Sequence, residues 1–180
     1  MMRAISLPAS LTWSTLFMRE NIGGCPRFLV TGESRRLARW LRLLGYDVVL
    51  APSQPLSPLV QRAVNEGRIV VTRSGQVSPS RLYRVVRLAS QELEPQLRQL
   101  VRELGLAIDE RRAFSRCDVC NVPVEPAEKA AIRGRVPPYV YETQTSFHRC
   151  PSCQRIYWAA THWERACRVF ARLREEASHA

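Results

Sequence analysis

The stretch RFLVTGESRRLARWLRLLGYDVVLA, residues 27–51, decides the fold class of this chain. Residues 27–31 form a short apolar run that predicts a buried strand, and Gly32 breaks it. The apolar spacing that follows predicts a helix over 35–44. Residues 46–51 form a second short apolar run. A strand, a helix and another strand in such close succession indicate a βαβ unit with parallel strands.

The predicted helix has one apolar face and one basic face. Ser34 can cap its first turn, and Gly45 suits the left-handed residue that ends it. The apolar side chains recur at i, i+3, i+4 and i+7, so we expect them to pack on the sheet: Leu37, Trp40, Leu41 and Leu44. The arginines fall on the opposite face: Arg35, Arg36, Arg39 and Arg42. We therefore expect the arginines to point outward, where their replacement leaves stability almost unchanged.

Further along the chain the same pattern returns. A helix is predicted over 57–66 and a third strand over 68–72. A fourth strand is predicted over 84–88, after a connection that is short for a crossover helix. Another helix is predicted over 93–104. The succession predicts an α/β fold with a parallel sheet flanked by helices.

The chain divides into three predicted parts. Residues 1–26 are expected to be a flexible N-terminal extension, 27–108 an α/β domain, and 109–180 a cysteine module that ends in a basic helix. The apolar stretch in the extension is broken by Pro8 and does not match a signal peptide, and Met18 is an alternative start. No run approaches the roughly 20 apolar residues of a membrane helix.

Two cysteine pairs are the strongest chemical signal in the sequence. They are Cys117-Asp118-Val119-Cys120 and Cys150-Pro151-Ser152-Cys153. Two such turns facing each other build a tetrahedral sulfur cage, which suits Zn²⁺. The alternatives are a disulfide or a thioredoxin-like redox pair, but redox pairs come singly after a strand of a βαβ unit. We predict a structural zinc ribbon and, without an export signal, a cytoplasmic protein.

The charge balance is strongly basic and rests on arginine. The net charge is +11 over 180 residues, and Lys129 is the only lysine. Arginine forks match phosphate oxygens and stack on bases, which indicates a nucleic acid such as RNA as partner. A genome that prefers arginine codons would give the same composition, so both readings stay open at this point.

Five motifs in fixed order carry a resemblance to a known family. They are RLARWLRLLGYD (36–47), EGRIVVTR (66–73), CDVCN (117–121), RVPPYV (135–140) and RCPSCQRIYW (149–158). Together they resemble the Mut-seven C-terminal domain family, a PIN-like ribonuclease fold with a zinc ribbon attached. The resemblance implies carboxylates at the carboxyl ends of parallel strands, where they hold Mg²⁺ or Mn²⁺ that activates water against a phosphodiester.

The positions that the resemblance assigns to metal-binding acids hold other residues in this chain. Thr31 stands after the first strand, Ser57 opens the second helix, and Ser74 follows the third strand. Glu33 is the nearest substitute, because it lies two residues past the first strand. Glu66 is expected to be solvated at a helix end. The sequence thus predicts a degenerate nuclease, with Mg²⁺ or Mn²⁺ relevant only if catalysis survives.

Three functions remain open at the level of sequence. The first is an RNA-binding pseudo-nuclease that uses the arginines: Arg35, Arg36, Arg39, Arg42 and Arg73. The second is an active metal-dependent ribonuclease that uses Glu33. The third is an adaptor whose zinc ribbon docks on a protein partner. Aromatic residues of the cysteine module could stack unpaired bases, although small ribbons also need aromatics for their core.

Overall fold

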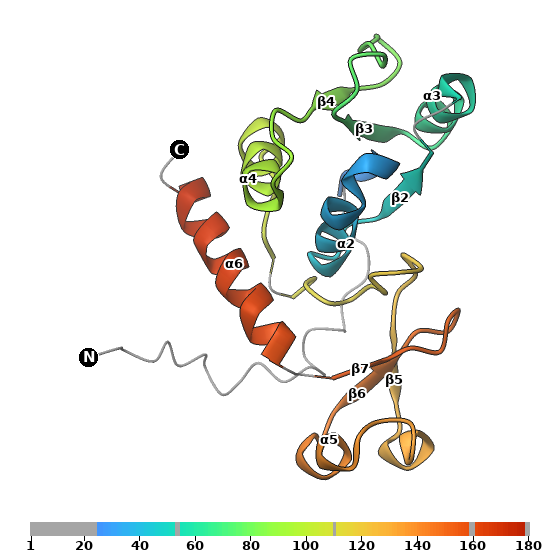
Figure 1. Ribbon diagram of the computed structural model, residues 1–180, viewed down its shortest axis with the longest axis vertical. Helices are drawn as coiled ribbons and strands as arrows, with labels where there is room; N and C mark the ends of the chain where they lie inside the picture. Colours follow the sequence, from blue (N-terminus) through green and yellow to red (C-terminus); the bar gives the residue numbers. More distant parts are fainter. Residues whose placement is uncertain (1–24, 53–54, 110, 159–160, 179–180) are drawn as a thin grey trace.

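The computed structural model describes residues 25–52, 55–109, 111–158 and 161–178. Nearly all of the predicted extension therefore lies outside the described residues. Two sheets are present, a four-stranded one and a three-stranded one (Figure 1). Within the described residues, no helix is both long enough and apolar enough to cross a membrane.

The larger sheet is parallel throughout. Its strands are β1 (Arg27–Thr31), β2 (Val48–Ala51), β3 (Arg68–Thr72) and β4 (Val85–Arg87), in the order β2-β1-β3-β4. No helix separates β3 from β4, so the short connection expected from the sequence is confirmed. The parallel sheet with its helices confirms the predicted α/β class.

Helices cover both faces of this sheet. The helices are α2 (Arg35–Leu43), α3 (Leu56–Asn65), α4 (Leu93–Leu104) and α6 (Thr161–Ser178), and the 3-10 turn η1 (Gly32–Ser34) precedes α2. One core joins the sheet to α2, α4 and α6, whereas a smaller core joins it to α3. Successive residues of β1 serve the two cores in turn: Phe28 and Val30 face the first, and Leu29 the second.

The two ends of α2 differ in how well the sequence predicts them. Ser34 does not cap the helix, because its Oγ is buried in η1 and has no hydrogen-bond partner among the described residues. Gly45 follows the helix at a φ of 86°, as predicted. A Cβ at this position would lie 2.3 Å from the Arg112 carbonyl oxygen, so the close approach also requires glycine.

The apolar face of α2 packs as expected, with one difference. Leu37, Leu41 and Leu44 are fully buried, but Trp40 is only partly buried. Its ring contacts Phe170 of α6 edge-on, with the ring centroids 5.7 Å apart. Trp40 therefore fastens the C-terminal helix to α2, and this helix joins the core of the parallel sheet.

The smaller sheet is antiparallel. Its strands are β5 (Glu125–Ala127), β6 (Phe147–Arg149) and β7 (Ile156–Tyr157). Between β5 and β6 the chain forms the 3-10 turn η2 (Lys129–Ile132) and the short helix α5 (Pro138–Thr143). The cysteine pairs lie in the turns just before β5 and between β6 and β7.

Candidate metal centre and sheet-edge site

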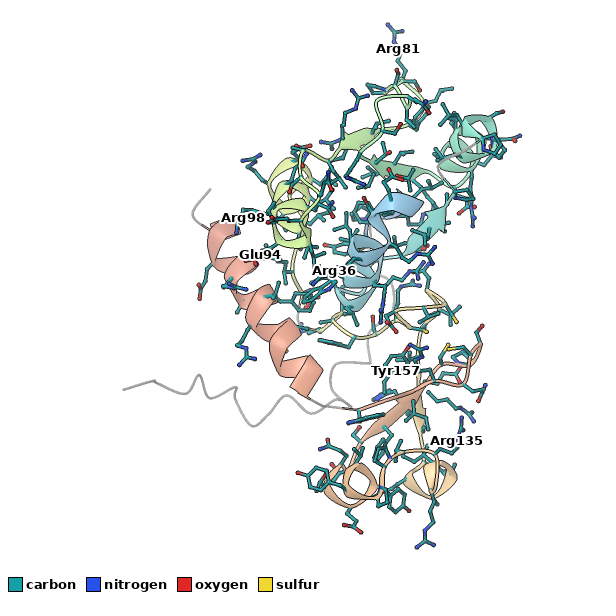
Figure 2. The ribbon with its side chains drawn as sticks, in the orientation of Figure 1. Arg36, Arg81, Glu94, Arg98, Arg135 and Tyr157 are labelled. Atoms are coloured by element: carbon teal, nitrogen blue, oxygen red, sulfur yellow. The ribbon has the colours of Figure 1, made fainter. Side chains whose placement is uncertain are left out.

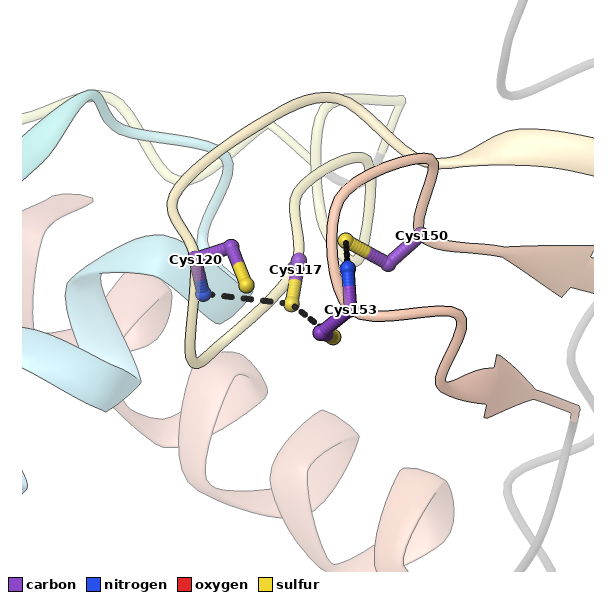
Figure 3. Close-up of side chains that lie close together, drawn as sticks. All are labelled: Cys117, Cys120, Cys150 and Cys153. Carbon is purple, nitrogen blue, oxygen red and sulfur yellow. Dashed lines mark hydrogen bonds between the residues drawn. The ribbon is translucent and has the colours of Figure 1, made fainter.

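The four cysteines of the smaller unit come together in space. The sulfur atoms of Cys117, Cys120, Cys150 and Cys153 all lie within 4.8 Å of one another (Figure 3). The Sγ atoms of Cys117 and Cys153 are 3.8 Å apart. Four sulfurs at 2.3 Å from a tetrahedral Zn²⁺ would be about 3.8 Å apart, so the cluster fits a metal such as zinc.

The two cysteine turns share one local geometry, which explains why they converge. In each turn the amide of the second cysteine donates to the sulfur of the first, at 3.2 Å for Cys120 and 3.4 Å for Cys153. The next residue then takes a left-handed conformation, with φ 65° at Asn121 and 59° at Gln154. Both turns therefore present two sulfurs to one point, as a four-thiolate site requires.

The thiols differ in how readily they ionise. Burial opposes ionisation of Cys117, but hydrogen bonds from the Tyr157 hydroxyl and from backbone amides outweigh it and lower its pKa to about 7. Burial raises the pKa of Cys150 to about 12. A bound metal deprotonates a coordinating thiol outright, so metal binding would be needed to bring Cys150 to the thiolate form.

A second candidate site lies at the carboxyl edge of the parallel sheet. The Glu33 carboxylate turns back to this edge, where its Oε1 accepts from the Thr31 hydroxyl and from the Thr72 hydroxyl, the latter at 3.0 Å. The backbone amide of Arg73 donates to the same oxygen at 3.2 Å. Glu33 thus reaches the strand ends as the sequence suggested, and there it bridges β1 and β3.

The other two predicted positions do not join Glu33. Ser57 is exposed near the start of α3, and the Ser74 hydroxyl accepts from the amide of Gln76 at 3.2 Å. Among the described residues, only the four cysteines form a group of three or more side chains that could hold a metal ion. The sheet edge therefore combines one carboxylate with hydroxyls.

The five predicted arginines differ in how far they are buried and in their partners. Arg35 and Arg36 are exposed, as expected, and Arg73 is half-buried beside Glu33. Figure 2 shows Arg36 reaching from α2 toward the space between α2 and α6. Arg39 keeps an exposed side chain but forms an ion pair with Asp118 of the first cysteine turn. The prediction that Arg42 points outward is wrong, because Arg42 is buried.

Arg42 is buried because it holds the first cysteine turn against the parallel sheet. Its guanidinium donates to the Val48 carbonyl oxygen from Nε and Nη2, at 3.0 and 2.8 Å. It also donates from Nη1 to the carbonyl oxygens of Asp118 and Val119, at 3.0 and 2.7 Å. The guanidinium group of Arg42 is thus surrounded by main-chain carbonyl oxygens. Helical periodicity alone does not predict this burial.

A polar network at the amino edge of the sheet completes this contact. Arg68 donates to both carboxylate oxygens of Asp47, at 2.9 and 3.0 Å. Asn121 donates to Asp47 at 2.7 Å and accepts from the Val48 amide at 2.9 Å. Burial opposes ionisation of Asp47, but these hydrogen bonds outweigh it and lower its pKa. Glu66, expected to be solvated at a helix end, is one third exposed there and also accepts from Arg68.

The roles of Asp118 and Asn121 were not predicted from the sequence. Both lie in the motif CDVCN, Asp118 between the two cysteines and Asn121 directly after them, where the metal-ligand pattern itself gives neither residue a role. The Asp118 side chain is 8% exposed and accepts from the Tyr157 hydroxyl at 2.9 Å as well as from Arg39. The available signal in the sequence was an acid between two predicted metal ligands, because a carboxylate that becomes buried in such a turn requires a partner.

Comparison with known proteins agrees with this architecture. The family model described as Mut7-C RNAse domain matches residues 26–170, which include both sheets and the four cysteines. The chain belongs to the Mut7-C RNAse domain family. No curated protein and no solved structure gave a match. For this Mut7-C domain, the predicted PIN-like α/β architecture followed by a four-cysteine module is confirmed.

Proposed function

We propose that this protein binds RNA through the Mut7-C fold without cleaving it by a metal-dependent route. The observation that carries the proposal is the carboxyl edge of the sheet, where Glu33 hydrogen-bonds with Thr31, Thr72 and the Arg73 amide. Mg²⁺ binds through carboxylates and phosphates in near-octahedral geometry. A single carboxylate that already bridges two strands is a poor Mg²⁺ site.

RNA binding is supported by the charge and by the family. The net charge of +11 favours a polyanion, and arginine is the residue best suited to phosphate. Arg35, Arg36 and Arg73 remain available as contacts, whereas Arg42 holds the first cysteine turn against the parallel sheet. The four cysteines would hold Zn²⁺, whose chemistry here is structural, because four thiolates leave no open position for a substrate.

The test is a combined binding and cleavage assay on the zinc-loaded protein. A labelled single-stranded RNA is incubated with the protein, with and without Mn²⁺. The zinc content of the protein is measured afterwards, because the test requires that the four cysteines keep their metal. We expect the RNA to bind equally in both conditions and to keep its full length. Cleavage that requires Mn²⁺ and is lost in Glu33→Gln would establish the active ribonuclease instead.

The same assay also tests the adaptor function. A protein that neither binds nor cleaves RNA at low salt would contradict the proposal. The arginines would then serve only solubility and the contact of the first cysteine turn with the parallel sheet. An adaptor whose zinc ribbon docks on a protein partner would become the leading function. The measurement therefore separates all three functions.

A further inference from the structure

Two cavities flank the first cysteine turn, and they differ in chemistry. The larger one, about 1690 Å³, lies between α2, α4 and α6. The smaller one, about 840 Å³, lies between α2, the edge strand β2 and the turn that carries Cys120. Arg39, Asp118 and Arg155 line both, so the two cavities meet at these three residues.

Charge distinguishes the two cavities. Five arginines and five carboxylates line the larger cavity, and Arg172 and Glu94 approach to 3.5 Å within it. Seven arginines but only two carboxylates, Asp47 and Asp118, line the smaller one. A cavity lined by one sign of charge focuses the field and attracts the opposite charge. The smaller cavity, called the basic pocket from here on, is therefore the stronger anion site.

Several arginines of the basic pocket are not saturated by the protein. Arg35 has no hydrogen-bond or ion-pair partner among the described residues, and Arg116 donates only from Nη1, to the Asn121 carbonyl oxygen. Arg155 lies 4.0 Å from Asp118 with half of its side chain exposed. Each guanidinium carries five N–H donors, so these three side chains retain donors for a ligand.

Other residues make the base of the pocket rigid. Arg42 and Arg68 are buried, and their hydrogen bonds go to main-chain carbonyls, to Asp47 and to Glu66. They add positive charge without side-chain freedom, so a ligand would not have to order them. The pocket is thus preorganised at its base, and its rim keeps donors available.

We propose that the phosphate backbone of a single-stranded RNA binds in the basic pocket, between edge strand β2 and the first cysteine turn. This inference rests on the proposed function and names the place on the molecule where it occurs. In this position the RNA lies beside the first cysteine turn and not at the carboxyl edge of the sheet. The bound segment contacts Arg35 at the start of α2, Arg116 directly before the first cysteine turn, and Arg155 just after the second.

The neighbouring cavity explains why a single strand fits better than a duplex. Trp40, Tyr157 and Trp158 line the larger cavity, which meets the basic pocket at Arg39 and Arg155. Unpaired bases that leave the backbone at this point can stack on partly exposed aromatic rings. Paired bases cannot turn outward in this way, so we expect duplex RNA to bind more weakly.

The test compares two triple variants of the full-length, zinc-loaded chain. The first carries Arg35→Gln, Arg116→Gln and Arg155→Gln. The control carries Arg81→Gln, Arg102→Gln and Arg111→Gln, which removes the same charge from exposed positions outside the basic pocket. Arg81 lies at the tip of the β3–β4 connection, far from the ribbon (Figure 2). Fluorescence anisotropy measures the affinity for a short labelled single-stranded RNA over a range of salt concentrations.

We expect the pocket variant to lose at least about tenfold in affinity and to flatten the logarithmic salt slope by about 2, because three phosphate contacts are lost. The control variant should keep the logarithmic salt slope of the parent, to within about the change that one lost phosphate contact would cause. Equal losses in both variants would overturn the inference and leave RNA binding by a diffuse basic surface. A parent protein that binds no RNA would contradict the proposed function itself. If the triple variant does not fold, Arg35→Gln alone is compared with Arg81→Gln alone, because Arg35 has no partner within the part of the chain that the structure describes.

Discussion

The two edges of the parallel sheet use charge in different ways. At the carboxyl edge, one carboxylate accepts from two threonine hydroxyls and a backbone amide. At the amino edge, Asp47, Arg68 and Asn121 form a network, and Arg42 beside them ties the first cysteine turn to the sheet. Buried and half-buried charged groups thus form a connected network where the first cysteine turn meets the parallel sheet, whereas the edge expected to hold a catalytic metal has one carboxylate that contacts the strand ends.

The largest expected effect comes from the four cysteines, on which the contact at the amino edge depends. Cys117→Ser should abolish stoichiometric zinc binding and unfold the smaller sheet, because structural zinc contributes about 10 kcal/mol or more to folding. Metal analysis and circular dichroism give the readout. Cys25→Ser is the control, since Cys25 lies outside the cluster. Freshly reduced parent protein that contains no zinc would contradict the prediction.

The next largest effect concerns Arg42, which holds the first cysteine turn against the parallel sheet. Arg42→Gln should lower the free energy of unfolding by about 3 kcal/mol, because it leaves buried carbonyl oxygens without donors. Arg36→Gln, on an exposed position of the same helix, should change it by less than about 0.5 kcal/mol. Urea denaturation of the zinc-loaded proteins measures both. Equal stability of the two variants would mean that the Arg42 contact is unimportant.

A smaller effect is expected at the rim of the same contact. A double-mutant cycle of Arg39→Gln and Asp118→Asn should give a coupling energy of about 1 kcal/mol, because Asp118 is buried but Arg39 is half exposed. The coupling should weaken in high salt, since the arginine end is open to solvent. A coupling near zero at low salt would show that Arg39 is free to bind a ligand.

The smallest effect is expected at the carboxyl edge. Glu33→Gln should cost less than about 1 kcal/mol of stability, because the amide oxygen can still accept from Thr31 and Thr72. Thermal unfolding with and without Mn²⁺ measures this cost. A parent protein that Mn²⁺ stabilises, with the gain absent in Glu33→Gln, would show that this edge does bind metal.

Local patterns in the sequence predicted the elements whose structure depends on nearby residues. The apolar runs of β1, β2 and β3, the spacing in α2 and α4, and the left-handed Gly45 are all readable within a few positions. The spacing of the cysteine pairs likewise predicted the cluster, because the ligand chemistry of a metal restricts which residues converge.

Contacts between distant segments could not be predicted in this way. Arg42 has the helical position of a solvated residue, and only the arrival of Asp118 and Val119, more than seventy positions later, makes it a buried donor. Ser34 has the side chain of a helix cap, but the turn that brings Glu33 to the sheet edge buries its hydroxyl instead. A single sequence does not record which of its charged residues will meet.

Calorimetric titration of Mn²⁺ into the zinc-loaded protein tests the proposed function most directly. The parent should show no saturable Mn²⁺ binding, because Glu33 is the one carboxylate that contacts the carboxyl ends of the strands among the described residues. The variant Thr31→Asp with Ser74→Asp should gain Mn²⁺ affinity, since it adds one hard oxygen ligand beside Glu33 and a second one two residues past the end of β3. Saturable binding to the parent that Glu33→Gln removes would contradict the account and favour the metal-dependent ribonuclease.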